Sequence, residues 1–435
     1  MDLSAHQKFT HNAIDRQNNQ LLKQAFDVLK PKLNIDVLCE TDQASCIQIA
    51  EQFGSIDNKL NDWKNLWISY INCIINKKLG YLYKACLHLT KTTDQLTLLI
   101  RRYGLQQGFW FYSLLGNLCR DLRLMTYQAD IAAEYNVYDS NGKRLLLCED
   151  LALDCISRCF RLSVNFDRQL YNSSRPLLVT LANQNLKVYS HLGNFTLVKS
   201  LIKTVEERSQ LKLNSSIADQ VTYNYYHALQ ILNSSSNSHQ MVQSMKLLEW
   251  AYKKMPVNEC RLNRRLILLR LIPLKILFDG KLPSKALFEK ECIDEYAGIC
   301  AALKLGNIAQ YNRLMKLYQP VLFRYGTITL FDEIRLLVYR QFIFRIELIL
   351  KESKYNVQIF VDLICIMSDI QCEQRLIDNE DDMNSSADIE FISIVFELMR
   401  RGLLKAKLAS SKKLRLLFRR KEAFPKPCAS LLSPK

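Results

Sequence analysis

Apolar and polar positions follow a helical period over most of the chain and switch to a strand period only near its end. After Asp388, apolar residues recur at helical spacing, which predicts a helix that buries one face. Arg400 and Arg401 precede Gly402, the usual order of a basic last turn and a glycine stop. The positions expected on the buried face are Ile392, Val395, Phe396 and Met399.

Beyond Gly402 the period falls to two, and apolar residues alternate with cations on both sides of Ser410-Ser411. This pattern predicts a two-stranded hairpin with one apolar and one cationic face. A helix, a glycine and a basic hairpin follow each other in the second half of a winged helix. We expect the apolar positions to bind a partner: Leu404, Leu408, Leu414, Leu416 and Phe418. The candidate nucleic-acid-binding cations of this segment are Lys405, Lys407, Lys412, Lys413 and Arg415.

The rest of the chain reads as helices separated by short turns. An amphipathic helix begins near Leu60, and glycine turns at Gly80, Gly193 and Gly306 each separate two helical segments. Repeated helix–turn–helix units without strands predict an all-α solenoid resembling tetratricopeptide repeats, although no strict 34-residue period is present. Further helices are predicted at 149–162, 183–203, 241–254, 258–280, 329–350 and 357–370, with a helix pair at 110–130, marginal helices in 1–60 and an exposed acidic loop at 372–387.

These elements predict a division of the chain into consecutive regions. Residues 1–116 would hold N-terminal helices, and 117–220 a helical-repeat region. A C-terminal domain would occupy 221–425, with a helical part at 221–328 and the winged helix at 329–425, before a tail at 426–435.

Composition narrows the class of protein. The chain has 435 residues, of which 49% are hydrophobic, and only 12 Gly and 9 Pro, which favours an ordered, helix-rich protein. Its apolar runs are too short to span a bilayer, and the N-terminal turns lack a signal-peptide core. We therefore expect a soluble intracellular chain without a membrane partner.

The cysteines and histidines predict no metal centre. None of the 14 cysteines forms a Cys-x-x-Cys pair, and the six histidines are scattered. Cys155 and Cys159 are the nearest pair and would share one helical face. Buried, reduced thiols are therefore expected, with no metal and no other cofactor.

The net charge of +16 is concentrated toward the C-terminus, since residues 388–435 hold twelve Lys and Arg against four Asp and Glu. Scattered surface charge is usually only solvated. Concentration on one face of one hairpin instead favours nucleic acid or an acidic protein as partner. The predicted helix at 258–280 adds Arg261 and Arg264 as candidate nucleic-acid contacts, beside the plainer interpretation of a core helix with surface arginines.

Several segments of the chain form one recognisable pattern. Its main run is Asn263-Arg264-Arg265-Leu266-Ile267-Leu268, Leu271-Ile272-Pro273, Gly280, Pro283, Leu305-Gly306-Asn307 and Val338-Tyr339-Arg340. This run resembles the PCI-domain family of the proteasome lid, the COP-9 signalosome and translation initiation factor three, and the resemblance covers roughly Asn117 to Pro425. Asp121-Leu122-Arg123, Ala129-Asp130, Asn185-Leu186-Lys187-Val188-Tyr189 and Ala423-Phe424-Pro425 resemble one branch, which holds the signalosome subunit twelve proteins and the PCI subunit of the TREX-2 mRNA-export complex.

The resemblance implies a non-catalytic scaffold in nucleus and cytoplasm that joins other PCI subunits through its winged helix. A signalosome-type complex acting in cullin deneddylation is one expectation. A TREX-2-like subunit acting in mRNA export or splicing, with a small acidic Sem-type protein, is the alternative. RNA or DNA binding is compatible with both, and the sequence distinguishes neither the complex nor its stoichiometry.

The motifs of the common enzyme classes are missing. The chain has no Gly-x-Ser-x-Gly, no phosphate-binding glycine loop and no His-Glu-x-x-His. The paired acids Asp381 and Asp382 have no histidine or lysine nearby in the sequence. No catalytic residue is therefore predicted.

Overall fold

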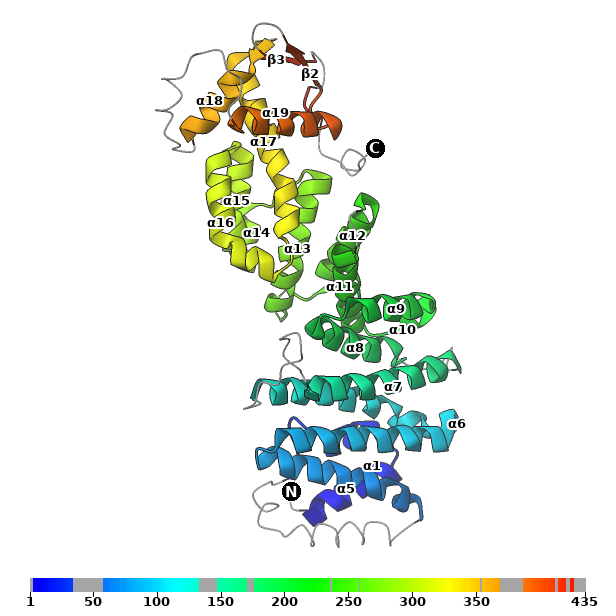
Figure 1. The fold of residues 1–435 in the computed structure, drawn as a ribbon. Helices are drawn as coiled ribbons and strands as arrows, with labels where there is room; N and C mark the ends of the chain where they lie inside the picture. Colours follow the sequence, from blue (N-terminus) through cyan, green and yellow to red (C-terminus); the bar gives the residue numbers. More distant parts are fainter. Residues whose placement is uncertain are drawn as a thin grey trace. The chain divides into compact units, whose positions relative to one another are not determined.

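The computed structural model describes residues 3–33, 58–132, 147–169, 176–234, 237–257, 259–352, 354–367, 386–410, 414–419 and 423–425. These residues form helices and one small sheet near the C-terminus, which confirms the predicted all-α solenoid ending in a winged helix (Figure 1). The chain divides into two compact units, residues 1–226 and 227–435. The boundary predicted at 116/117 lies inside a helix, and the one predicted at 220/221 lies close to the division between the units.

The first unit is a stack of helices, most of which pack on a neighbour in the chain (Figure 1). Its elements are α1 (Leu3–Asp15), α2 (Asn19–Ala25), α5 (Asn58–Lys78), α6 (Leu82–Ala132), α7 (Leu147–Gln169), α8 (Leu178–Leu192), α9 (Phe195–Glu206), α10 (Ser209–Asn214) and the first part of α11 (Ile217–Ser234). The pair predicted at 110–130 is wrong, because these residues form one continuous part of α6. The kink in that helix lies earlier, at Gly104, which has a φ of 64°.

The N-terminal helices are better packed than their polar sequence predicts. His6 of α1 is fully buried, and its Nε2 lies 3.0 Å from the carbonyl oxygen of Ala25 in α2. The indole N–H of Trp67 in α5 donates to Nδ1 of the same ring at 3.2 Å. A buried histidine therefore joins three helices, and such a polar core position leaves no apolar period in the sequence.

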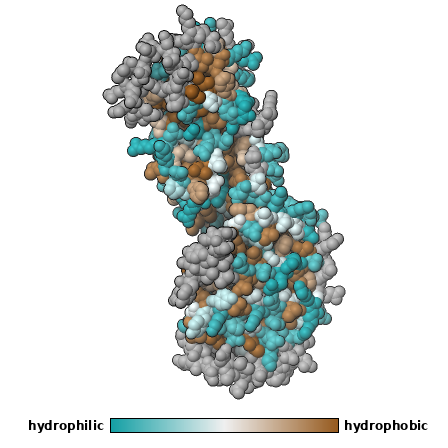
Figure 2. Space-filling view, in the orientation of Figure 1, coloured by the Kyte–Doolittle hydropathy of each residue, from teal (hydrophilic) through white to brown (hydrophobic). Residues whose placement is uncertain are grey.

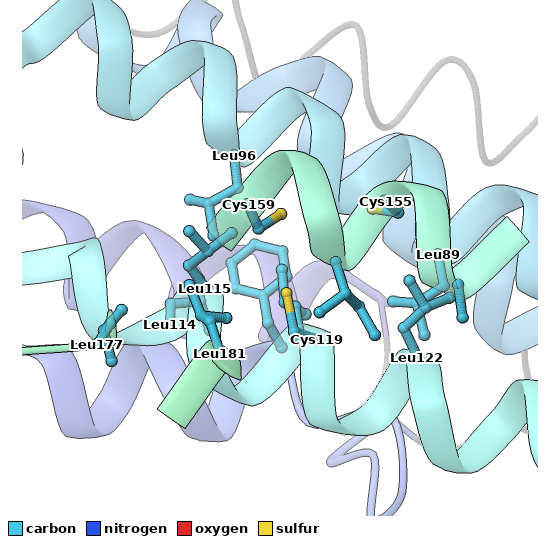
Figure 3. Close-up of a cluster of buried hydrophobic side chains, with 14 of the residues drawn as sticks. Leu89, Leu96, Leu114, Leu115, Cys119, Leu122, Cys155, Cys159, Leu177 and Leu181 are labelled. Atoms are coloured by element: carbon cyan, nitrogen blue, oxygen red, sulfur yellow. The ribbon is translucent and has the colours of Figure 1, made fainter. Parts of the chain in front are cut away.

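The core of this unit contains thiols among leucines. Figure 3 shows Cys119, Cys155 and Cys159 beside leucine side chains of α6 and α8. All three cysteines are buried and free, as predicted. A hydrogen bond with Cys159 and burial both raise the pKa of Cys155, so the unreactive thiol is favoured. Among the described residues, no group of three or more His, Cys, Asp or Glu could hold a metal ion.

The second unit is also mainly helical and ends in the winged helix. Its elements are α12 (Ser238–Lys254), α13 (Arg261–Asp279), α14 (Lys285–Glu291), α15 (Asp294–Leu305), α16 (Ile308–Arg324), α17 (Ile328–Leu350), β1 (Lys354–Asn356), α18 (Val357–Met367), α19 (Ser386–Arg400), β2 (Ala406–Ser410) and β3 (Leu414–Phe418). Helix α13 continues through Pro273, where a kink or an end was predicted. Most of the predicted acidic loop lies outside the described residues.

The turn between α15 and α16 requires a glycine at position 306. Gly306 has a φ of 66°, and a Cβ at this position would lie 2.7 Å from the main-chain nitrogen of Phe342 in α17. Asn307 then caps α16, because its Oδ1 accepts from the N–H of Gln310 at 2.9 Å. The glycine supplies both a left-handed turn and a close helix contact, which confirms the predicted turn.

No described helix combines the length and apolar character that crossing a membrane requires. Figure 2 shows hydrophilic and hydrophobic residues interspersed over the described surface on this side of the molecule.

Candidate partner and nucleic-acid interface

The winged helix closes with a three-stranded antiparallel sheet of order β1-β3-β2. The predicted hairpin is confirmed, with Leu408 opposite Leu416 in its register. Strand β1 was not predicted, because three residues leave almost no periodic signal and their partner strand lies far away in sequence. It places β3 in the centre of the sheet and leaves β2 at one edge of the described part.

The inner face of the sheet is the core of the winged helix. Tyr355 of β1 lies opposite Leu416 of β3, and both are fully buried. A series of packed aromatic rings connects the sheet with the helices around it. Successive centroids are 5.1 to 5.9 Å apart along the series Phe344, Phe424, Phe418, Tyr355, Phe360 and Phe391.

This packing corrects part of the predicted partner surface. Leu404 and Leu416 are at most 1% exposed, and Phe418 packs between Tyr355 and Phe424. Leu404 and Leu416 stabilise the subdomain itself and are not free to receive a partner, whereas Phe418 is half-buried and stays a candidate. Leu408 and Leu414 are half-buried, so they remain candidates for a partner contact.

The predicted face of the preceding helix is also shifted. The buried positions of α19 are Phe391, Ile394, Val395 and Leu398. Phe396, which was expected in the core, is 56% exposed, so that prediction is wrong. The ring of Phe391 stacks on Phe360 of α18 and thereby selects a face about one residue away from the predicted one.

Residues on the outer face of the sheet are mainly cationic or small. Directly opposite residues share a face, and the register places Lys354 and Lys407 beside Leu417, and Ala409 beside Arg415. Lys354, Lys407 and Arg415 are exposed. Arg419 follows in the same alternation and is exposed as well, whereas Lys405 is half-buried. No acidic residue occupies a described strand position on this face, and Lys412 and Lys413 lie outside the described residues.

The two arginines predicted on the 258–280 helix have different surroundings. Arg261 is exposed at the first position of α13. Arg264 is 5% exposed, and its guanidinium donates to Oε1 of Glu291 in α14 at 2.8 Å. It also donates to the carbonyl oxygen of Met255 at 3.1 Å and lies over the ring of Tyr252. Arg264 therefore joins α12, α13 and α14 and is not available to a phosphate, which corrects its predicted role.

The edge strand exposes main-chain groups. The N–H of Arg419 donates to the carbonyl oxygen of Lys405 at 3.0 Å, so residue 405 directs that carbonyl toward the β3 side of the sheet. Bonded and non-bonded positions alternate along an antiparallel pair. Ala409 therefore faces β3 in the same way, while Ala406 and Leu408 direct their N–H and C=O groups toward the open edge. An open edge of this kind can pair with another strand.

The segment after the hairpin is held by one arginine. Arg340 of α17 donates from its guanidinium to the carbonyl oxygens of Leu403, Phe424 and Pro425 at 3.2, 3.0 and 2.8 Å. Burial lowers the pKa of Arg340. The N–H of Lys405 donates to the carbonyl oxygen of Ala423 at 2.8 Å, which fixes the start of the same segment.

Parts of the chain are similar in sequence to known proteins. No protein-family model matches the chain. The chain is 29% identical over 261 residues to the PCI domain-containing protein 2 homolog of Dictyostelium discoideum, covering 59% of both proteins. It is 27% identical over 256 residues to the homolog of Drosophila melanogaster, covering 59% of this chain and 61% of that protein. It is also 30% identical over 218 residues to the protein CSN12 homolog of Debaryomyces hansenii, covering 47% and 48%.

The helical stack with its terminal winged helix is the architecture that the resemblance predicted, and the relatives are PCI-domain proteins. The chain is related to the PCI-domain proteins, and its relatives include the CSN12 branch, as the resemblance predicted. The aligned part spans about three fifths of the length of the first two relatives.

Proposed function

We propose that the chain is a non-catalytic PCI scaffold subunit of a COP-9 signalosome-type complex, which docks on a second PCI chain through the open edge of β2. The observation that carries the proposal is the outward direction of the main-chain groups of Ala406 and Leu408. The half-buried Leu408 and Leu414 lie at the same end of the hairpin. A strand from a partner can extend the sheet there, with the two leucines supplying apolar contact.

Co-purification of the tagged chain from cells, followed by mass spectrometry, tests which complex contains it. We expect PCI subunits of a signalosome-type complex. Recovery of mRNA-export factors with a small acidic Sem-type protein would assign the chain to a TREX-2-like complex instead. Recovery of the chain without any PCI-domain protein would contradict the scaffold proposal.

A second function, binding of RNA or DNA without sequence preference, is favoured by the outer face of the sheet. Lys354, Lys407, Arg415 and Arg419 are exposed there, and no described strand position on that face opposes them with an acid. Such a surface suits a phosphate backbone, because phosphate contacts position a protein without reading bases. The face and the edge are separate features, so the two functions are separable by mutation.

The variant that tests this function reverses the four charges to Glu. We expect it to lose RNA and DNA binding while it still co-purifies with PCI subunits, because neither the inner face nor the β2 edge is changed. Equal nucleic-acid affinities for the wild-type and reversed chains would exclude the outer face as the binding surface.

A further inference from the structure

Two cationic side chains of the first unit, Arg123 of α6 and Lys187 of α8, lie near enough for the charge of one to act on the other. The guanidinium of Arg123 donates through Nε to Oε1 of Gln184 at 2.8 Å. Lys187 lies one helical turn beyond Gln184, on the same side of α8. Both cations are half-buried, and Gln184 is 6% exposed. Arg123, Gln184 and Lys187 lie outside the winged helix, so the docking proposed above does not use them.

Neither cation of this pair forms a salt bridge among the described residues, although Tyr226 and Glu149 act on Arg123 and Asp219 acts on Lys187 from a distance. The amide of Gln184 is the one hydrogen-bond partner of Arg123, and Lys187 has none among the described residues. Burial lowers the pKa of Lys187, and the positive charge of Arg123 lowers it further. Burial also lowers the pKa of Arg123. Two half-buried cations that act on each other are unfavourable unless an anion joins them.

The nearest carboxylates are committed to other groups. Asp219 of α11 accepts from the hydroxyls of Thr180 and Ser216 at 2.9 and 2.7 Å. It also accepts from the side-chain amide of Asn183 at 3.2 Å. Glu149 of α7 is paired with Nδ1 of His191 at 2.8 Å. These acids lie close enough to raise the pKa values of Lys187 and Arg123, but neither forms an ion pair with them.

We propose that Arg123, Gln184 and Lys187 form a binding site for an oxyanion, a carboxylate or phosphate group carried by a ligand. Gln184 holds the guanidinium through Nε and leaves its two terminal nitrogens for the two oxygens of the anion. A guanidinium fork matches carboxylate and phosphate geometry, and the ammonium of Lys187 adds a point charge. The anionic group of the ligand would form the ion pair that neither Arg123 nor Lys187 forms with a described carboxylate.

Thermal unfolding of the full chain tests the site with sodium phosphate and with glutarate, each compared with sodium chloride at equal ionic strength. A bound ligand stabilises the folded state by mass action, so we expect the midpoint to rise by about 2–4 °C with at least one of them. A rise with phosphate alone would assign a phosphate ligand, and a rise with glutarate alone a carboxylate. No rise with either anion would overturn the proposal.

Two variants separate the site from general salt effects. Lys187→Met keeps the length of the side chain and removes its charge, and Lys199→Met removes an exposed charge of α9 in the same unit. We expect the rise to vanish in the first variant and to persist in the second. We also expect Lys187→Met without ligand to be at least as stable as the wild type, because an unpaired buried charge is gone. An equal anion-induced rise in wild type and Lys187→Met would exclude the site.

Chemical reactivity gives a readout that does not depend on a variant. A lysine with a lowered pKa holds more of the reactive neutral amine, so acetic anhydride should label Lys187 faster than its half-buried position alone would allow. The anion that raises the midpoint should slow this labelling and leave Lys199 unchanged. Labelling of Lys187 that is indifferent to that anion would contradict binding at this site.

Discussion

Lys354 of β1 lies directly opposite Leu417 of β3, and Lys407 of β2 faces the same leucine from the other side. Two lysines far apart in sequence therefore flank one apolar residue on the outer face of the sheet. The cationic surface is thus built by all three strands. Its charge depends on the short strand that completes the sheet as well as on the hairpin.

The first prediction concerns the salt dependence of nucleic-acid binding. If Lys354, Lys407, Arg415 and Arg419 neutralise about four phosphates of duplex DNA, log affinity should fall with log salt at a slope of about −3.6. Lys354→Ala should make this slope shallower by about 0.9, although the residue lies outside the hairpin. Fluorescence anisotropy across a salt series measures both values. Lys316→Ala, which removes an exposed lysine of α16, is the control and should leave the slope unchanged. An unchanged slope in Lys354→Ala would remove β1 from the binding face.

The second prediction concerns Arg340, which holds the segment after the hairpin. Arg340→Met leaves the carbonyl oxygens of Leu403, Phe424 and Pro425 without their donor and should destabilise the winged helix by about 2–3 kcal/mol. Hydrogen exchange of the β2 and β3 amides measures the loss locally. Arg345→Met on the same helix is the control, because its guanidinium donates to one carbonyl and is exposed. Equal exchange in the two variants would show that the three hydrogen bonds do not hold the sheet.

The third prediction uses two glycines with similar dihedral angles. Gly306 and Gly326 have φ values of 66° and 65°, and only Gly306 faces the backbone of a neighbouring helix. A left-handed conformation costs a non-glycine residue about 1–2 kcal/mol, so Gly326→Ala should lose about that much. Gly306→Ala should lose at least about 1 kcal/mol more, because its Cβ overlaps the main chain of Phe342. Urea unfolding of both variants measures these losses in the free energy of unfolding. Equal losses would mean that α17 moves away from the new Cβ at no cost in free energy.

The fourth prediction is a pH dependence that arises at His6. Burial lowers the pKa of this histidine to about 4, against 6.5 for the free side chain. Its neutral form is favoured in the fold, so its stabilisation is complete above pH 6.5 and is lost as the pH falls toward 4. The full effect is about 3 kcal/mol. Asp167 acts in the opposite direction, because burial raises its pKa to about 6 and acidification removes the penalty of its buried charge.

A matched pair of variants isolates the contribution of His6. Urea unfolding is measured at pH 7 and pH 5 by tryptophan fluorescence, to which Trp67, the donor to the His6 ring, contributes. The stability difference between the two pH values should shrink in His6→Gln and persist in His11→Gln, whose ring lies at the surface beside Asp15. The same pH difference in His6→Gln and in the wild type would assign the effect to other groups.

The sequence predicted those elements whose signal is local. The helix after Asp388 and the hairpin after Gly402 could be predicted, because the change in the spacing of apolar residues is visible in neighbouring residues alone. Strand β1 was not predicted, because its three residues pair with β3, which lies far away in the sequence. The face of α19 was shifted because stacking of Phe391 on Phe360, and not the strongest apolar period, selects which side is buried.

The candidate site was predictable to a similar extent. Alternation correctly indicates which hairpin residues share a face, but it does not indicate what covers that face. Leu404 and Leu416 are covered by their own subdomain and not by a partner. Arg264 resembles a surface cation in sequence, and only the fold brings Glu291 against it. The oxyanion site proposed at Arg123 and Lys187 has no sequence signal, because it depends on two helices packing together.

The most direct test of the proposed scaffold function is the affinity of the purified chain for the PCI subunit with which it co-purifies, measured for wild type and Ala406→Pro. Proline is tolerated where an edge N–H faces solvent, so this variant should keep its own sheet while removing a donor from the edge. Ala409→Pro is the matched control that should break the sheet itself, because that N–H faces β3. The account predicts that Ala406→Pro weakens binding about 10- to 100-fold with circular dichroism unchanged. Wild-type affinity in a folded Ala406→Pro chain would contradict docking through the β2 edge.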